Sequence, residues 1–312
     1  MPISNMSVSK GIRRQFKKAS RSKYLLFMML FPFAYLIIFC YLPIYGVRIA
    51  FMDYNIFLGI DKSDWVGFAN FISFFKSVYF GRLLRNTLVI SLLHIILAFP
   101  ASILFALMVN EIRNKHLKKA AQSIAYLPHF ISAVVVAGLV MSVLATRTGI
   151  LNQIRAFFGL EKISFLNEAD YFPWIIVAAD IWQGTGWGSI IYLAAITAID
   201  PTLYEAAMVD GASRFKQLLN ITLPSIMPTI IIQFILRIGS MFTVGYQKIL
   251  LLYNESVYER ADVIGTYVYR RGLLQQDYSF GSAVDLFNNV LNFIMLITFN
   301  AICRRFSETS LW

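Results

Sequence analysis

The sequence predicts an all-α integral membrane protein with six transmembrane helices. Hydrophobic residues make up 58% of the 312 residues, charged residues only 14%, and the mean hydropathy is +0.62. A soluble domain is usually about half apolar and about a quarter charged. A spanning helix needs roughly 20 mostly apolar residues, and hydrocarbon offers an open backbone no hydrogen-bond partners. Six runs meet this length, near 24–47, 84–109, 122–146, 173–198, 225–247 and 281–303.

Positive charge alternates along the chain in a way that predicts the orientation. The cations ahead of the first run have no acid among them, and later cations fall in alternate connections and in the tail. They are Lys10, Arg13, Arg14, Lys17, Lys18, Arg21 and Lys23, then Arg113, Lys115, Lys118 and Lys119, then Arg214 and Lys216, then Arg304 and Arg305. By the positive-inside rule these segments are cytoplasmic, so both termini should be inside. The net charge of +11 therefore indicates an orientation signal beside anionic lipid, not an arm for nucleic acid.

The expected organisation has three parts. Residues 1–23 form a basic cytoplasmic segment, residues 24–303 a six-span transmembrane domain, and residues 304–312 a cytoplasmic tail. The first run is too long for a cleaved signal peptide and lacks a small-x-small cleavage site. Cys40 and Cys303 fall toward opposite leaflets, so neither a disulfide nor a metal site is expected. Apolar residues at helical spacing over 150–158 predict an amphipathic surface helix that Gly159 ends.

A polar break between the fourth and fifth runs carries the strongest functional pattern. Asp200-Pro201 places an N-cap before a proline at the first helical position. Ala206 and Ala207 permit close approach by another surface, and Gly211 can adopt positive φ and turn the chain. A second short apolar face follows before Pro224. This helix–turn–helix, at about 199–224, is too short to bury its own apolar surface and needs a partner.

The order and spacing of this break resemble the cytoplasmic "EAA" loop of binding-protein-dependent ABC importer permeases. The resemblance implies the type I ABC importer permease fold and a loop that docks onto an ATPase, with Glu205 accepting charge-assisted bonds there. An ordinary amphipathic loop lying on the membrane is the alternative interpretation. The coupling residues would be Glu205, Ala206, Ala207, Asp210, Gly211, Ile221, Leu223 and Pro224.

Two further segments narrow the resemblance to sugar importers. Trp65-Val66-Gly67 with Asn70-Phe71, followed by Asn86-Thr87, is similar to the first outer connection of sugar-importer permeases, of which the maltose permease is one. The stretch 253–270 and the ending 307–312 look like the subgroup for complex oligo- and polysaccharides.

The resemblance also implies partners and a location. A second homologous permease subunit, two ATPase subunits and an extracellular solute-binding protein would assemble with this chain in the bacterial cytoplasmic membrane, which it would cross several times. No Gly-Lys pair occurs, so the phosphate-cradling G-x-x-x-x-G-K-[ST] loop is absent. ATP and Mg would therefore be bound by the partner ATPase, and this chain is expected to bind no cofactor or metal and to be no enzyme.

Polar residues inside the runs are candidates for the substrate path. Gln183 and Trp187 could hydrogen-bond to and stack on a sugar, or serve tight helix packing and an outer aromatic belt. Arg237 is costly on lipid; it could pair internally with Asp180 or Asp285, or attract an acidic sugar. The asparagines of the sixth run could line the path or bond between helices, and the bend at Pro128 could be packing or path. The candidates are Ser132, Gln183, Trp187, Arg237, Thr243, Tyr246, Gln247, Asn289 and Asn292.

Two other functions remain open at this point. Asp180, Arg237 and Asp285 could form the relay of an ion-coupled secondary transporter, although the coupling pattern argues against it. A non-transporting scaffold or sensor is the third alternative. The sequence leaves open the sugar, its length and its charge, and which of the two permeases contacts it.

Overall fold

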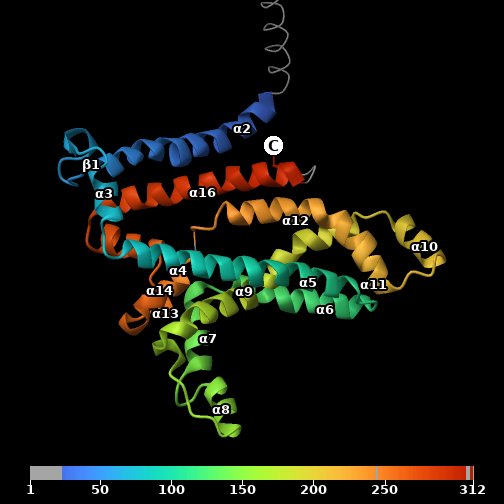
Figure 1. The fold of residues 1–312 in the computed structure, drawn as a ribbon. Helices are drawn as coiled ribbons and strands as arrows, with labels where there is room; N and C mark the ends of the chain where they lie inside the picture. The colour runs from blue at the N-terminus through green and yellow to red at the C-terminus, as the bar shows by residue number, and fades with distance from the viewer. Residues whose placement is uncertain (1–22, 244, 307–309, 312) are drawn as a thin grey trace, which may run out of the picture. The chain divides into compact units, whose positions relative to one another are not determined.

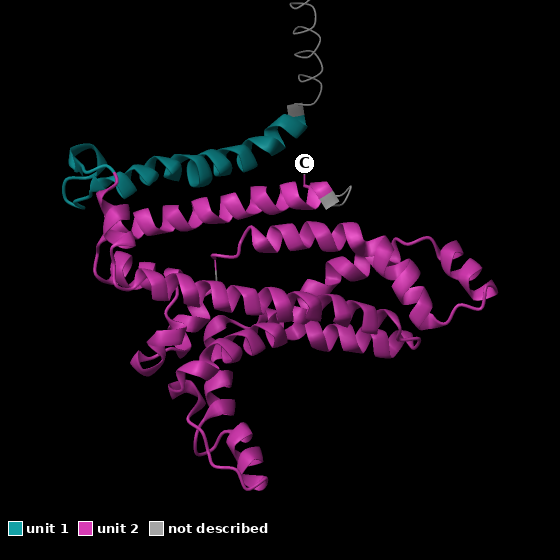
Figure 2. Ribbon diagram, in the orientation of Figure 1, with its two compact units in different colours: residues 1–67 teal, residues 68–312 magenta. Residues whose placement is uncertain are grey.

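The computed structural model describes residues 23–243, 245–306, 310 and 311. Most of the basic N-terminal segment and of the tail predicted at 304–312 lies outside these residues. The chain divides into two compact units, residues 1–67 and 68–312 (Figure 2).

The described part of the first unit is one long apolar helix followed by a small hairpin. Helix α2 (Lys23–Tyr35) continues through a π turn and a 3-10 turn to Phe51. Strand β1 (Met52–Asp53) then pairs antiparallel with β2 (Asp64–Trp65), and the rings of Phe51 and Trp65 stack 5.6 Å apart. The hairpin is a small departure from the all-helical expectation.

The second unit contains three continuous helical segments that can span a membrane. The first joins α4 (Phe80–Leu93) and α5 (Phe99–Asn110) through a π turn at His94–Ala98. The second joins α11 (Arg214–Gln217) and α12 (Leu223–Ile238) through another π turn. The third is α16 (Tyr278–Phe306). With Tyr24–Phe51 of the first unit there are four candidate spans among the described residues, and six if each of two bent helix pairs is one span.

The first bent pair contains the proline that predicted a bend. Helix α6 (Lys115–Tyr126) runs through a 3-10 turn at Leu127–Phe130 and meets α7 (Ala133–Leu144) at 103°. Proline lacks the N–H that would continue the helix. Ser132 caps the new helix by accepting a bond from the Val135 N–H.

The second bent pair is α9 with α10. Helix α9 (Phe172–Thr197) meets α10 (Pro201–Val209) at 69°. The small residues of α9 allow close packing: a Cβ on Gly186 would lie 2.0 Å from the carbonyl oxygen of Ala125 in α6. Helix α9 also packs along α5, and α12 lies between α9 and α16 (Figure 1).

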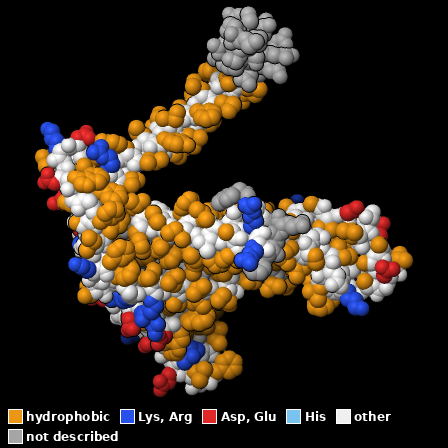
Figure 3. Space-filling view, turned by 45° about the horizontal axis from the view of Figure 1, so that its top comes forward, with side chains coloured by type: hydrophobic (Ala, Val, Ile, Leu, Met, Phe, Trp, Pro, Cys, Tyr) orange, Lys and Arg blue, Asp and Glu red, His pale blue; other side chains and the backbone are white. Residues whose placement is uncertain are grey.

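Short helices gather at two ends of the second unit. At one end lie α10 and α11; near the other lie α3 (Ala69–Phe75), α13 (Tyr246–Leu252), α14 (Tyr258–Ala261) and α15 (Ile264–Val268) (Figure 1). Helix α8 (Ile150–Phe157) projects beside α7 and ends before Gly159, whose φ is 73°, as predicted. Hydrophobic side chains cover the middle of the unit, and charged ones appear at the α10 end (Figure 3).

Ion pairs tie together connections that the charge pattern places on the same side. Arg214 lies 3.3 Å from Glu111, which joins the second-to-third and fourth-to-fifth connections. Arg260 lies 3.3 Å from Asp170. This pair joins the third-to-fourth and fifth-to-sixth connections, which the charge pattern places on the opposite side. The grouping of the connections at two ends therefore agrees with the alternation read from the sequence. Cys40 and Cys303 are both free.

Candidate transport cavity and coupling loop

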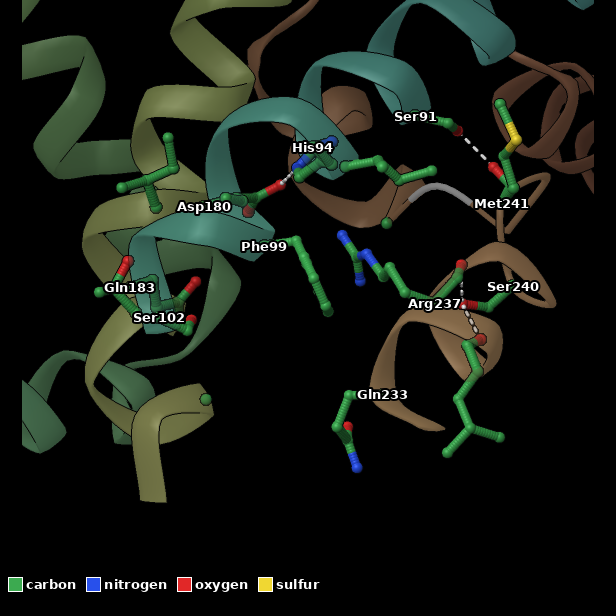
Figure 4. A pocket seen from close by; sticks show the side chains of 18 of the residues that line it. Ser91, His94, Phe99, Ser102, Asp180, Gln183, Gln233, Arg237, Ser240 and Met241 are labelled. Carbon is green, nitrogen blue, oxygen red and sulfur yellow. Dashed lines mark hydrogen bonds and ion pairs between the residues drawn. The ribbon is translucent and has the colours of Figure 1, made fainter. Parts of the chain in front are cut away.

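A cavity of about 720 Å³ lies among α4, α5, α9, α12 and α13. Its wall is mixed: Phe99 and Tyr192 bring aromatic rings, while Ser91, Ser102 and Gln233 bring hydrogen-bonding groups. Figure 4 shows the polar side chains converging on this space from different helices. Pockets that bind small molecules typically measure about 300–1,000 Å³ and combine apolar walls with a few placed polar groups.

One carboxylate on the wall is held by two neighbours. The Nε2 atom of His94 lies 2.6 Å from Oδ2 of Asp180, while Nδ1 of the same ring lies 2.8 Å from the Ile90 carbonyl oxygen and donates to it. The Lys248 ammonium donates to the other oxygen of Asp180. This cluster links α4, α9 and α13, and its side chains are 7% exposed for His94, 24% for Asp180 and 17% for Lys248.

Arg237 brings a second cation to the cavity. Arg237 is an exposed residue, and its guanidinium points into the cavity across from His94 and Asp180 (Figure 4). Within the described chain it forms no ion pair, so the expected pairing with Asp180 or Asp285 is absent. Asp180 is engaged by His94 and Lys248 instead. Leaving His94 and His129 aside, the cations Arg237 and Lys248 and the carboxylate of Asp180 sum to a formal charge of +1 on the cavity wall.

Three of the predicted path residues line the cavity: Gln183, Arg237 and Thr243. Gln183 also donates to the Ile131 carbonyl at 2.8 Å, which supplies a partner at the α6–α7 bend. Trp187 does not line the cavity; its ring stacks on His129, which does, with centroids 4.5 Å apart. Ser132 lies at the start of α7, away from the wall.

The remaining predicted path residues lie beside the wall or away from it. Asn292 accepts from the Phe242 N–H and donates to Thr243, both at 2.9 Å, so it bonds between α16 and the segment after α12. Asn289 is exposed and donates to Asp285 at 3.2 Å. Tyr246 packs against Gly265, and Gln247 is exposed outside the cavity.

His94 and Lys248 are wall residues that the sequence reasoning passed over. Both are ionisable groups within or next to apolar runs, which is itself a signal for a functional or paired side chain. Lys248 directly follows the two residues that were chosen. One residue of a helix turns the side chain by about 100°, so Tyr246 and Gln247 lie off the face of α13 that brings Lys248 to the cavity wall.

The predicted coupling segment folds as the local sequence dictates. Asp200 caps α10 by accepting from the Thr202 N–H at 2.9 Å, and this bond holds the pKa of the Asp200 carboxyl below its usual value. At the other end Gly211 has φ 73°, its N–H donates to Met208, and the Ala212 N–H donates to Ala207. These two bonds and the left-handed glycine form a Schellman motif.

The surface of this segment is open. Glu205, Ala206, Asp210, Gly211 and Pro224 are exposed, while Ala207, Ile221 and Leu223 are partly buried. Apolar side chains beside them are also uncovered: Met208 is 60% exposed, Val209 88% and Phe215 68%.

Polar contacts join α10 to the turn before α12 and α11 to the end of α5. The Tyr204 hydroxyl lies 2.8 Å from Thr222 Oγ1, and Arg214 pairs with Glu111. The described residues contain no group of three or more His, Cys, Asp or Glu side chains that could hold a metal ion.

Comparisons with known proteins identify the class. A family model described as the inner membrane component of binding-protein-dependent transport systems matches residues 98–302, and the chain belongs to this family. The match covers the predicted coupling segment and the cavity wall apart from Ser91, His94 and Ile95, and it bears out the resemblance found in the sequence.

Full-length relatives place the chain more closely. Protein LplB of Bacillus subtilis (strain 168) is 42% identical over 94% of this chain and 92% of its own length. The polygalacturonan/rhamnogalacturonan transport system permease protein YteP of the same organism is 41% identical over 96% and 94%.

Solved structures confirm the fold. A bacterial ABC transporter involved in the import of the acidic polysaccharide alginate matches with a TM-score of 0.86 and 41% identity, over 94% of this chain and 99% of that one. A bacterial alginate ABC transporter in complex with an alginate pentasaccharide-bound periplasmic protein matches with a TM-score of 0.87, over 96% and 100%. The chain thus has the type I ABC permease fold.

Proposed function

We propose that this chain is a permease subunit of an ATP-driven ABC importer that moves an acidic oligo- or polysaccharide. The observation that carries the proposal is the unpaired, exposed guanidinium of Arg237 in a cavity that also holds Lys248. A guanidinium matches the geometry of a carboxylate and binds it through paired hydrogen bonds. Two relatives at about 41% identity carry acidic polymers in their names, polygalacturonan and alginate.

The wall offers separate roles for substrate handling. Arg237 would meet the carboxylate of one sugar unit, while Ser102, Gln183 and Gln233 would bond to its hydroxyl groups. The ring of Phe99 would pack against the apolar face of the sugar. Asp180 keeps Lys248 in place and prevents the cavity from holding two uncompensated cations. The cavity would then bind the substrate weakly enough to release it.

The α10 segment would connect this cavity to ATP hydrolysis. Its open apolar surface and exposed Glu205 support docking into a cleft on a separate ATPase subunit, which would bind ATP and Mg. Closure of two such subunits would pull on α10 and, through the Tyr204–Thr222 contact, on α12. Helix α12 carries Arg237, so the pull would change the accessible side of the cavity.

The assembly would contain a second homologous permease subunit and a solute-binding protein that delivers the saccharide. The chain would cross the bacterial cytoplasmic membrane six times with both termini inside. The positive charge at Arg214 and Lys216 supports a cytoplasmic position for the coupling segment.

Reconstituted transport tests the proposal. The permease pair, the ATPases and the binding protein would be placed in liposomes, and ATP-dependent uptake of trigalacturonate and of neutral maltotriose would be measured. Removing the charge with Arg237→Gln should lower uptake of trigalacturonate by about tenfold or more, because a charge-assisted bond contributes about 1.5–3 kcal/mol. Arg237→Lys should retain part of the uptake.

Two results would contradict the proposal. Uptake of trigalacturonate at the original rate in Arg237→Gln would remove the assigned role of that side chain. Uptake driven by an ion gradient without the ATPase would favour the relay through Asp180 instead.

A further inference from the structure

A second hollow, of about 640 Å³, lies at the end of the larger unit opposite α10. It is bordered by the start of α4, by α14 and α15, and by the π turn from Tyr269 to Leu274. Three arginines and three tyrosines make up most of its wall. They are Arg82, Arg270, Arg271, Tyr79, Tyr258 and Tyr267.

The cations of this hollow outnumber the carboxylates that hold them. Arg82 and Arg270 share one carboxylate, that of Asp262, which is fully buried behind them; its Oδ2 atom lies 3.2 Å from one guanidinium and 2.8 Å from the other. Arg271 lies 3.1 Å from Asp277. Three positive charges therefore face two negative ones, and two guanidiniums stand side by side on one anion.

Arg82 keeps most of its hydrogen-bonding capacity unused. A guanidinium has five N–H donors, and among the described residues Arg82 donates only through one terminal nitrogen to Asp262. Its Nε atom is buried without a partner. The Arg82 side chain is 29% exposed, and an anion between the arginines would accept from its remaining terminal N–H groups.

Aromatic rings line the same hollow and stiffen the arginines. The Arg82 guanidinium lies 5.0 Å from the centroid of Tyr79, and that of Arg270 lies 5.1 Å from Tyr258. Tyr79 is 44% exposed. An exposed aromatic ring beside cations suits a ligand with both apolar C–H faces and carboxylates.

The backbone around the hollow is closely packed. A Cβ on Gly281 would lie 2.8 Å from the Cα of Gly272, so the π turn sits directly against α16. Gln276, which follows this turn, has φ 59°, a conformation that a residue with a side chain adopts only when its surroundings impose it. The positions of Arg270 and Arg271 are therefore set before any ligand arrives.

We propose that this hollow is a second saccharide site, which binds a carboxylate-bearing sugar unit between Arg82 and Arg271. The inference rests on the proposed acidic cargo and adds a second position for the same chain of sugars. Its concave shape and volume match a pocket for a small ligand, whereas a protein partner usually covers a flat area of about 800 Å² on each side.

Equilibrium binding to the permease–ATPase complex in nanodiscs tests the site. The probe is trigalacturonate, titrated without the solute-binding protein and in an Arg237→Gln background, so that the first cavity contributes little. Arg82→Gln and Arg271→Gln should each weaken binding by about tenfold or more. Tyr79→Leu, which leaves every charge in place, should weaken it by a smaller factor.

The chain supplies a matched control at the same end. Arg260→Gln also removes one positive charge, but Arg260 pairs with Asp170 and does not line the hollow; binding should stay within about twofold of the parent. Arg82→Gln also leaves Arg270 alone on Asp262, so only protein that elutes as the assembled complex is titrated, and Arg271→Gln provides the independent result.

Three results would overturn the second site. Equal binding in all variants would exclude it, as would equal binding of neutral maltotriose. If the variants leave trigalacturonate binding unchanged but raise the concentration of loaded binding protein needed for half-maximal uptake, the arginines contact that protein instead. Failure of the proposed cargo shows separately, as uptake that Arg237→Gln does not change.

Discussion

The two ends of the larger unit are built differently. At the α14 end, a buried carboxylate and several buried hydrogen bonds join connections that are far apart in the sequence. At the α10 end, the short helices are exposed and touch the bundle at few points. One end is complete within this chain, and the other presents a surface that another chain can cover.

The α14 end is organised around Asp262. Its carboxylate is fully buried and accepts from Arg82, Arg270 and Thr266. Asn86 in α4 donates to the carbonyls of Glu259 and Asp262, both at 2.9 Å. Burial opposes the charge of Arg270, but the hydrogen bond and charge of Asp262 outweigh it and raise the pKa of the guanidinium above its usual value. The charged side chains of Arg82, Arg270 and Asp262 therefore hold one another in place.

The α10 end lacks a comparable centre among its described residues. The Arg214–Glu111 pair is exposed, with side-chain exposures of 55% and 44%, and exposed pairs contribute little. The Tyr204–Thr222 hydrogen bond reaches a buried side chain, that of Thr222. This difference suits the proposed function, in which the chain would hold its shape at one end and follow an ATPase at the other.

The largest effect is expected at Asp262. Asp262→Asn leaves two guanidiniums beside each other without their shared anion. Breaking a buried ion pair by removing one partner costs about 3–5 kcal/mol, so the thermal unfolding midpoint of the purified permease complex should fall sharply. Scanning fluorimetry of the detergent-solubilised complex measures this shift.

Asp170→Asn is the matched control for this change. It removes the same charge at the same end, but Asp170 is 86% exposed and its partner Arg260 is 42% exposed. Exposed pairs contribute about 0–1 kcal/mol, so the midpoint should move little. Equal shifts for the two variants would show that Asp262 does not organise this end.

The next effect is expected at the coupling segment. Gly211→Pro cannot adopt the positive φ of this position and loses the N–H that donates to Met208. Glu205→Lys reverses an exposed charge on α10. Both should lower ATP-dependent uptake by about tenfold or more while the chain still inserts into the membrane, because they change the docking surface and not the spans. Uptake and stimulated ATPase activity in proteoliposomes measure the loss.

Each of the two variants has a matched control. Glu255→Lys makes the same reversal at an exposed position near α14 and should leave uptake within about twofold. Gly211→Asn should lose less than Gly211→Pro, since asparagine tolerates the left-handed region. The assigned coupling role would be refuted if ATPase stimulation and uptake were unchanged in both Gly211→Pro and Glu205→Lys.

The same comparison shows what could be predicted from the sequence. At the α10 end the decisive signals are local: Asp200-Pro201 starts a helix and Gly211 ends it, and both predictions are confirmed. Helix starts and ends are determined by residues that are close together in the chain, so they can be predicted from a single sequence. The apolar runs are predictable for the same reason. The angle of 103° at the bend in the third run and the hairpin in the first connection were not predicted.

The cavity was less predictable because it is made by distant residues. Asp180 meets Lys248 and His94 across three helices, and no local pattern states that these helices are neighbours. Arg237 was found because a cation inside an apolar run is conspicuous, but its lack of a partner could not be seen. Asn292 holds a neighbouring segment instead of lining the cavity, which depends on the rotation of α16.

The smallest effect is a pH dependence confined to the α10 end. Because the bond from the Thr202 N–H lowers the pKa of Asp200, the folded helix favours the ionised carboxyl. The cap therefore stabilises α10 fully at pH values above the ordinary 3.8 and is lost as the pH falls through the lowered folded value. Hydrogen exchange of the α10 amides should accelerate, relative to the Asp200→Asn variant, on going from neutral pH to below 3.8. Asparagine caps helices without titrating, so parallel behaviour of the two proteins over this range would show that the carboxyl does not hold the start of α10.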